Sequence, residues 1–366
     1  MIHFEHFQFK QIDNELWLNW QKCSLNWRTL PLQSPNWLKP VAEASEGSLD
    51  NLFLLVAKKN KEYLGFFPYR IEQRLLGEII PLIYCLPWYD NLPSWITLTS
   101  DKEAGHQLLI EGFYKNLPKW HKLISGLVEH RNDTNNLEIN FFLENKLFFT
   151  SISEEMAEIR NIETFDEFLQ NQSKQWRKRY QKISKKLLAS KQANLQHYTD
   201  LNHDELELLT QRVMSIYRES WKVNDKQSLD FNLTNPQSYR SFYALIKSYA
   251  ECNGLHIMII SVNNEDAAFY VGVYQDGLYC SLQTAYKEKF ANLSVGYLIQ
   301  MENFRFTIEN NFERNNLLAN QSYKSNLTNQ IEHYSRYTVY SRSILGLMAR
   351  FLTYARQVIT NFKTKT

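Results

Sequence analysis

Hydrophobic positions alternate in some stretches of the chain and recur at helical spacing in others. In the first half, residues 51–72 carry two apolar runs around the polar segment Lys58–Glu62, which predicts two strands joined by a turn. Apolar spacing over residues 103–115 predicts a helix. Three shorter apolar runs predict further strands at 79–85, 124–127 and 137–143. We therefore expect residues 1–150 to form one mixed α/β unit.

The second half contains the clearest β pattern. The runs "LHIMIISV" (255–262), "AAFYVGVYQ" (267–275) and "GLYCSLQTAY" (277–286) predict a meander. Its turns contain Asn263-Asn264 and Asp276-Gly277, residue pairs typical of tight hairpins. Helical spacing and strand-like runs around this meander predict helices at 203–221, 238–252 and 297–310 and strands at 315–319 and 331–341. The expected fold class is α/β (α+β), with two tandem units, each a mixed sheet flanked by helices.

The segment "QWRKRYQKISKKLL" (175–188) has six positive charges and no carboxylate. Trp176, Tyr180, Ile183 and Leu187 recur at the spacing of one helical face, which predicts an amphipathic helix with cations over the remaining surface. Upstream, "TFDE" (164–167) has the form of a capping box, which predicts a helix start at Thr164.

A second basic amphipathic segment ends the chain. Residues 342–366 contain five cations and no acid, and apolar residues recur there at helical spacing. Such a helix either lies in a membrane interface or packs on its own domain with a solvated basic face, and both interpretations remain open. The sequence thus predicts boundaries at 1–150, 151–341 and 342–366.

Composition limits the functional classes. The formal net charge is only +2 over 366 residues, and no recognition motif accompanies the basic run, so binding of duplex DNA is not expected. The four cysteines show no zinc-type spacing, and no metal site is expected. The N-terminus lacks the apolar core of a signal peptide, and no apolar run is long enough to span a bilayer. A cytoplasmic location is expected, with peripheral membrane contact through 342–366 as the open question.

One local arrangement could hold a phosphate group. In "NLSVGYLIQ" (292–300), Ser294 and Gly296 stand at the predicted start of a long helix, where unpaired N–H groups and the helix dipole favour anions. An ordinary N-cap serine and a loop glycine explain the same residues. P-loop, dinucleotide, HExxH and GxSxG motifs are absent from the sequence.

The order of several motifs resembles a known family. "WRKRYQKISKKL", then "RESWK" (218–222), the meander, "LSVGYLIQ" and "NNLLANQSYK" (315–324) follow one another as in CelD-like acetyltransferases. These are GNAT-type domains related to the FemABX aminoacyl transferases. "LQSPNWL" (32–38) and "PWYDNL" (87–92) extend the resemblance into the first half. The chain departs from the family pattern at Val295 (usually Pro), at Asn315 (usually Asp) and at Leu318-Ala319 (usually Gly).

The resemblance implies two tandem GNAT-like units and a set of site residues. It implies catalytic roles for Lys324, Tyr323 and Asp90. It implies that acetyl-CoA or another acyl-CoA is bound by Ser294, Val295, Gly296, Tyr297, Arg177 and Arg179. The implied acceptor-binding residues are Gln283, Tyr286, Trp221, Lys222 and Tyr89.

The implied function is transfer of an acyl group, acetyl in the first instance, to an amine or hydroxyl. The expected acceptor is a sugar or nucleotide-sugar used in envelope polysaccharide synthesis. Two alternatives stay open: a FemABX-like aminoacyl transferase that takes its amino acid from charged tRNA, and a non-catalytic binding protein on a GNAT frame. The acceptor, the acyl group and the oligomeric state do not follow from the sequence.

Overall fold

The computed structural model describes residues 2–26, 30–44, 49–76, 80–87, 111–129, 137–224, 231–318 and 327–363. It is a mixed α/β protein, which confirms the expected fold class. The chain divides into two compact units: the first comprises 1–27, 47–154 and 333–366, and the second comprises 28–46 and 155–332. The division differs from the linear boundaries expected from the sequence, because residues 28–46 belong to the second unit and residues 333–366 to the first.

The first unit is built on a sheet with strand order β1-β2-β3-β4-β5-β12. These strands are β1 (Ile2–Gln8), β2 (Leu52–Lys59), β3 (Glu62–Leu76), β4 (Ile80–Pro87), β5 (Lys122–Glu129) and β12 (Gln330–Tyr340). The expected hairpin joins β2 and β3, with Asn60 at positive φ in the turn. The helices are α1 (Asn14–Asn26), α4 (Leu137–Glu144) and α11 (Ile344–Lys363), and residues 111–116 are also helical.

The strand expected at 137–143 is wrong, because this run forms the helix α4. Phe141 and Phe142, adjacent in sequence, both pack against Tyr114, with ring centroids 5.0 and 5.2 Å away. Adjacent residues of a strand point to opposite faces, so a strand could not place both rings there. A short apolar run does not distinguish the two structures by its periodicity.

The second unit has strand order β6-β11-β10-β9-β8-β7. The central meander is β8 (Leu255–Val262), β9 (Glu265–Gln275) and β10 (Leu278–Tyr286), as the sequence predicted. Both predicted turns carry two residues at positive φ, Asn263-Asn264 and Asp276-Gly277. The outer strands are β6 (Phe148–Arg160), β11 (Arg314–Asn316) and β7 (Ala193–Tyr198), and β7 lacked a distinct sequence signal.

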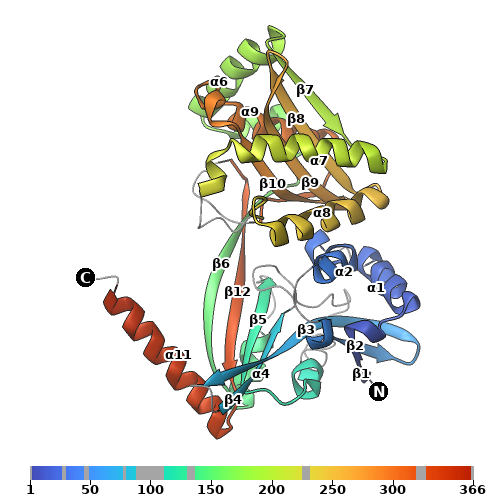
Figure 1. Ribbon diagram of the computed structural model, residues 1–366, viewed down its shortest axis with the longest axis vertical. Helices are drawn as coiled ribbons and strands as arrows, with labels where there is room; N and C mark the ends of the chain where they lie inside the picture. The colour runs from blue at the N-terminus through green and yellow to red at the C-terminus, as the bar shows by residue number, and fades with distance from the viewer. Residues whose placement is uncertain are drawn as a thin grey trace. The chain divides into compact units, whose positions relative to one another are not determined.

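Helices cover both faces of this sheet (Figure 1). Figure 1 shows α7 crossing in front of the meander. The helices are α2 (Pro35–Ala44), α5 (Phe165–Asn171), α6 (Lys174–Ser184), α7 (His203–Arg218), α8 (Pro236–Glu251) and α9 (Val295–Glu309). Thr164 is the N-cap of α5 and accepts a hydrogen bond from the Glu167 amide, as predicted. The Glu167 carboxylate, however, accepts from the amide of Glu163 rather than from that of the cap residue.

The basic run forms α6 followed by a π-helical turn, Lys185–Ala189. Of its predicted stripe, Tyr180 and Leu187 are buried, and Trp176 and Ile183 pack partly buried against the same core. The stripe is therefore confirmed as the inner face of the helix. Among the helices of the described ranges, none combines the length and hydropathy needed to cross a bilayer.

Candidate active site

The start of α9 lies next to the basic helix α6. Ser294, the N-cap of α9, is in the left-handed conformation with φ 56°, and its side chain caps no amide of the helix. Arg179 on α6 donates from Nη2 to Ser294 Oγ at 3.5 Å. A cation from the basic run thus meets the positive end of α9, and both favour an anion at this position.

Two aromatic rings hold Arg179 there. Its guanidinium carbon lies 4.5 Å from the ring centroid of Tyr297 and 5.6 Å from that of Trp176. The two rings are 5.0 Å apart, and the Tyr297 hydroxyl donates to the Trp176 carbonyl at 3.2 Å. Burial raises the pKa of Tyr297 to about 12, although Arg179 opposes the shift, so this hydroxyl stays protonated as a donor. Arg177, the other predicted phosphate ligand, has no described hydrogen bond or ion pair in this cluster.

Gly296 was expected from the sequence to help bind the donor at the helix start, and its Cβ side is packed. A Cβ built on Gly296 would lie 2.5 Å from Cδ1 of Tyr286, so the ring of Tyr286 occupies that side of the glycine. Tyr286, predicted as an acceptor-binding residue, therefore packs on the helix start. Val295 is fully buried.

Strand β10 extends beyond its described pairing with β11 and ends beside this helix start, where the Tyr286 ring lies against Gly296. The two strands pair in parallel over three positions only, Leu278 to Cys280 with Arg314 to Asn316. Beyond Cys280, β10 continues to Tyr286, and no strand pairing is described for its β11-side edge over that stretch. The β9 edge stays paired but has a bulge between Ser281 and Gln283. Unpaired strand N–H groups beside a bulge can bind an extended ligand or a developing oxyanion.

Gln283 has an unsatisfied acceptor at this bulge. It is 3% exposed, and its Nε2 donates to the Phe231 carbonyl at 3.0 Å. Its Oε1 is buried and has no hydrogen-bond partner. A buried acceptor without a donor costs about 1–3 kcal/mol, so a donor from a bound molecule would stabilise the site. Phe231 is followed by Leu233, Thr234 and Pro236, which help to line a pocket of about 540 Å³ with Arg218 and Tyr239.

The remaining predicted residues are placed as follows. Trp221 and Lys222 begin the 3-10 turn Trp221–Asn224 after α7, with Trp221 exposed and Lys222 buried. Lys222 Nζ is 5.9 Å from the Trp221 ring centroid. The predicted catalytic residues Lys324, Tyr323 and Asp90, and the acceptor candidate Tyr89, lie outside the described residues.

Sequence reasoning missed a buried chain of side-chain hydrogen bonds beside β10. Gln300 Nε2 donates to the Tyr270 hydroxyl, which donates to Ser281 Oγ. Ser281 Oγ donates to Asn315 Oδ1, and Asn315 Nδ2 donates to Thr307 Oγ1, both at 3.1 Å. Asn315 can occupy this place because an amide both accepts and donates, whereas an ionised aspartate only accepts. This departure from the family pattern therefore completes a structural network.

A buried carboxylate fixes the short strand β11. Glu158 on β6 is fully buried and accepts two hydrogen bonds from Arg314, each at 2.6 Å. It also accepts from Arg160 Nε at 2.6 Å and from Asn316 Nδ2. Leu318, which follows β11 where the family usually has glycine, has φ 67°, a conformation that glycine adopts with less strain. Neither feature was recognisable without knowing which strands are neighbours.

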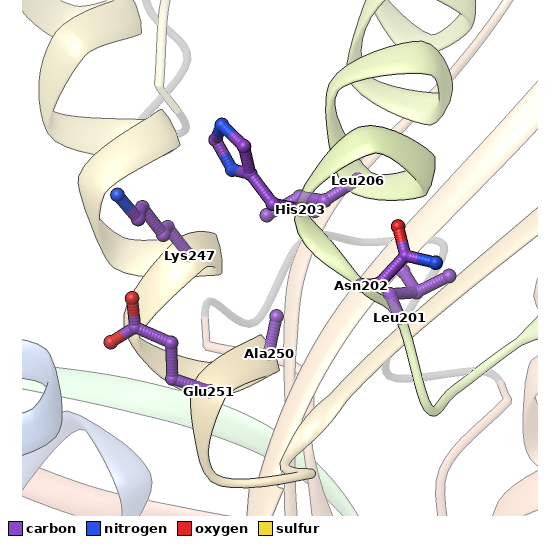
Figure 2. A pocket seen from close by; sticks show the side chains of 7 residues that line it. All are labelled: Leu201, Asn202, His203, Leu206, Lys247, Ala250 and Glu251. Carbon is purple, nitrogen blue, oxygen red and sulfur yellow. The ribbon is translucent and has the colours of Figure 1, made fainter.

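A separate pocket of about 310 Å³ lies between α7 and α8, and it contains none of the predicted site residues. Figure 2 shows His203, at the start of α7, facing the side of α8 that carries Lys247 and Glu251. Leu201, Asn202, Leu206 and Ala250 complete its lining. The candidate active site is instead the part of β10 beyond its described pairing with β11, together with the start of α9.

Comparison with known proteins identifies a domain that contains these elements. The family described as "Acetyltransferase (GNAT) domain" matches residues 174–325, a range that contains α6, the meander, α9 and β11. Residues 174–325 therefore form a GNAT-type acyltransferase domain, and such domains generally use an acyl-CoA as co-substrate. A search of curated protein sequences finds no match.

Two solved structures share the fold. The crystal structure of FemX superposes with a TM-score of 0.60 at 7% identity, over 86% of this chain and 95% of that one. The C-terminal domain of a putative lysylphosphatidylglycerol synthetase from Agrobacterium fabrum superposes with a TM-score of 0.52 at 8% identity, over 92% and 95% of the two chains. The GNAT resemblance is thus confirmed for residues 174–325, and the likeness to FemX is confirmed for the fold. The CelD-like subtype stays a prediction.

Proposed function

We propose that the 174–325 domain transfers an acyl group, acetyl in the first instance, from acyl-CoA to an amine or hydroxyl of a sugar or nucleotide-sugar. The observation that carries this proposal is the end of β10, which extends beyond its described pairing with β11 to the start of α9. Beyond Cys280, where no pairing with β11 is described, the backbone of β10 would offer hydrogen-bonding groups to an extended thioester arm. The α9 start and Arg179 offer the phosphates of coenzyme A a positive position at one end of that strand.

The residues present fit such a donor. Ser294 leaves the first amides of α9 without a side-chain cap, as an incoming phosphate requires. Arg179 is held by two aromatic rings, which reduces the side-chain entropy lost on binding. Gly296 contributes through its packing with Tyr286, which shapes the helix start.

The reaction follows from this placement. The acceptor nitrogen or oxygen attacks the thioester carbonyl and loses its proton to a base, and the coenzyme A sulfur leaves. Backbone N–H groups of β10 near the bulge would donate to the oxyanion that forms. Gln283 Oε1 would accept a hydrogen bond from the acceptor and orient it, which satisfies the buried oxygen. Lys324 remains the predicted cation near the carbonyl, and Lys324→Ala is expected to lower turnover without unfolding the protein.

Calorimetric titration with coenzyme A and acetyl-CoA tests the donor half of this proposal. Micromolar binding by the folded protein is expected, and absence of binding to both would contradict it. For the acceptor half, Gln283→Leu should lower kcat/KM for the acceptor by about tenfold to a hundredfold, the cost of one buried hydrogen bond. The same variant should bind acetyl-CoA with unchanged affinity, which separates acceptor recognition from misfolding.

The likeness to FemX supports a second candidate, an aminoacyl transferase supplied by charged tRNA. The two functions differ in the donor. Retention of aminoacyl-tRNA on a filter, weakening steeply with salt, together with no binding of acetyl-CoA, would favour this alternative. Binding of neither donor would favour the non-catalytic binding protein.

A further inference from the structure

We propose that α11, with the neighbouring end of α4 and start of β6, is a docking surface for an anionic lipid bilayer. All of these residues belong to the first unit. The proposal does not depend on the identity of donor or acceptor.

One stripe of α11 presents large apolar side chains to solvent. Ile344, Leu347, Phe351 and Tyr354 are 79, 43, 70 and 65% exposed. Their spacing of three, four and three residues places them on one face of the helix. The opposite face packs on the unit, where Leu345 and Ala349 contact Leu82 and Tyr340. The inner apolar face of the helix is therefore covered by the unit, and the outer apolar face is exposed to solvent.

The exposed stripe continues onto the neighbouring elements. Leu347 shares a shallow pocket of about 550 Å³ with Leu143 and Phe148. Leu143, on α4, is 60% exposed, and Phe148, at the start of β6, is 39% exposed. Exposed apolar side chains on three elements thus form one surface rather than isolated contacts, which is the pattern of an interaction site.

Cations surround this surface. Lys146 and Arg342 line the same pocket, and the Arg350 guanidinium carbon lies 4.1 Å from the Phe148 ring centroid. Glu144, next to Leu143, is the acid at that end of α4, whereas residues 342–366 contain five cations and no acid. Apolar side chains at the centre with arginines and lysine at the edge match a bilayer whose headgroups are negative.

This charge arrangement favours a bilayer over a second copy of the chain. In a two-fold dimer the same patch faces itself, so Arg342, Arg350 and Lys146 would approach their own equivalents and repel them. Anionic headgroups neutralise these cations instead, while Phe351 and the other apolar side chains enter the acyl boundary. Tyr354 suits the same depth, because its ring is apolar and its hydroxyl is polar.

Co-sedimentation of the full chain with vesicles tests the proposal. We expect binding to vesicles of phosphatidylcholine with phosphatidylglycerol, little binding to phosphatidylcholine alone, and release at high salt. The double variant Phe351→Asp/Tyr354→Asp should weaken binding by at least about tenfold, because it removes two exposed aromatic rings that would enter the bilayer. Leu208→Asp is the matched control, since Leu208 is a 60% exposed leucine on α7 in the other unit.

The charge contribution has its own pair of variants. Arg342→Glu/Arg350→Glu should weaken binding by about thirtyfold, because each cation near an anionic surface contributes about 1 kcal/mol. Arg240→Glu/Lys247→Glu, on exposed positions of α8, changes the net charge equally and should leave binding unchanged. Thermal melts establish that each variant is folded.

Three results would overturn the proposal. The first is no sedimentation of the wild-type chain with anionic vesicles. The second is equal loss of binding in the patch variants and their controls. The third is a wild-type dimer, seen by light scattering, that Phe351→Asp/Tyr354→Asp converts to a monomer, because the surface would then join two copies.

Discussion

The helices α6 and α11 are alike in sequence and opposite in structure. Both are amphipathic, rich in cations and poor in acids. The apolar stripe of α6 and of the π-helical turn after it faces inward, with Leu187 of that turn fully buried, whereas Ile344 and Phe351 of α11 are exposed. The difference lies in what surrounds each helix: α6 meets α9, while the outer face of α11 has no described element against it. Amphipathic periodicity identifies an apolar face, and it does not identify what covers that face.

The largest expected contrast comes from one leucine on each segment. Leu187→Ala removes a fully buried side chain and should lower the free energy of unfolding by about 2–5 kcal/mol. Leu347→Ala, on the exposed stripe of α11, should change it by less than about 0.5 kcal/mol. Urea unfolding of both variants measures the contrast. Equal losses would mean that α11 is as buried as α6, and would remove the basis of the comparison.

Tyr180 on α6 and Tyr354 on α11 give the second contrast. The Tyr180 hydroxyl donates to Glu302 Oε1 at 2.8 Å and accepts from Arg305 at 2.5 Å. Tyr180→Phe should cost about 1–3 kcal/mol of stability at neutral pH, since it leaves a buried carboxylate without a donor. Tyr354→Phe, on an exposed ring, should be near neutral. An equal effect of the two substitutions in urea unfolding would contradict this.

The contact between Tyr180 and Glu302 also predicts a pH dependence of stability. Burial raises the pKa of Glu302 above its ordinary value, and Arg305 and the Tyr180 hydroxyl oppose the shift. A carboxyl whose pKa is raised in the folded state stabilises the fold at low pH, and this contribution is lost as pH rises through the raised pKa. Tyr180→Phe removes one opposing contact, so its stability should fall further as pH rises from 4.5. Urea unfolding as a function of pH measures the slope, and parallel curves for wild type and variant would refute it.

Two arginines, one on each helix, test whether α6 and α11 differ in binding the donor. Arg179→Ala on α6 should weaken acetyl-CoA binding by about tenfold, the loss of one charge-assisted hydrogen bond. Arg350→Ala on α11 should leave that affinity unchanged. Calorimetry on both variants tests whether the basic helix of the GNAT domain, and not positive charge in general, binds the donor.

The smallest effect is expected at Arg177. It shares α6 with Arg179 and was expected from sequence to bind the same phosphate, but the described contacts bring only Arg179 to Ser294. Arg177→Ala should therefore weaken acetyl-CoA binding less than Arg179→Ala does. A larger loss at Arg177 would mean that the donor phosphates lie elsewhere on α6.

Much of the fold followed from local pattern. The meander, its two turns and the helices around it were predictable because strand alternation, helical spacing and Asn or Gly at positive φ are properties of neighbouring residues. The prediction for 137–143 was wrong because its length and composition suit a strand, whereas in the fold Phe141 and Phe142 both pack against Tyr114 from a helix. The crossing of residues 333–366 into the first unit was equally unpredictable, since nothing local marks which unit a strand joins.

The candidate site, like the fold, was only partly predictable from the sequence. The sequence alone determined the basic helix, the helix start at Ser294 and the order of motifs, because these depend on residues close together in the chain. Tertiary structure decided that Arg179 and not Arg177 reaches Ser294, that Gly296 accommodates Tyr286, and that Gln283 buries an unsatisfied oxygen. It also decided that one basic helix covers a core while the other presents its apolar stripe to solvent. Such outcomes depend on which distant segments meet, and hydrophobic burial is non-directional and does not specify the partner.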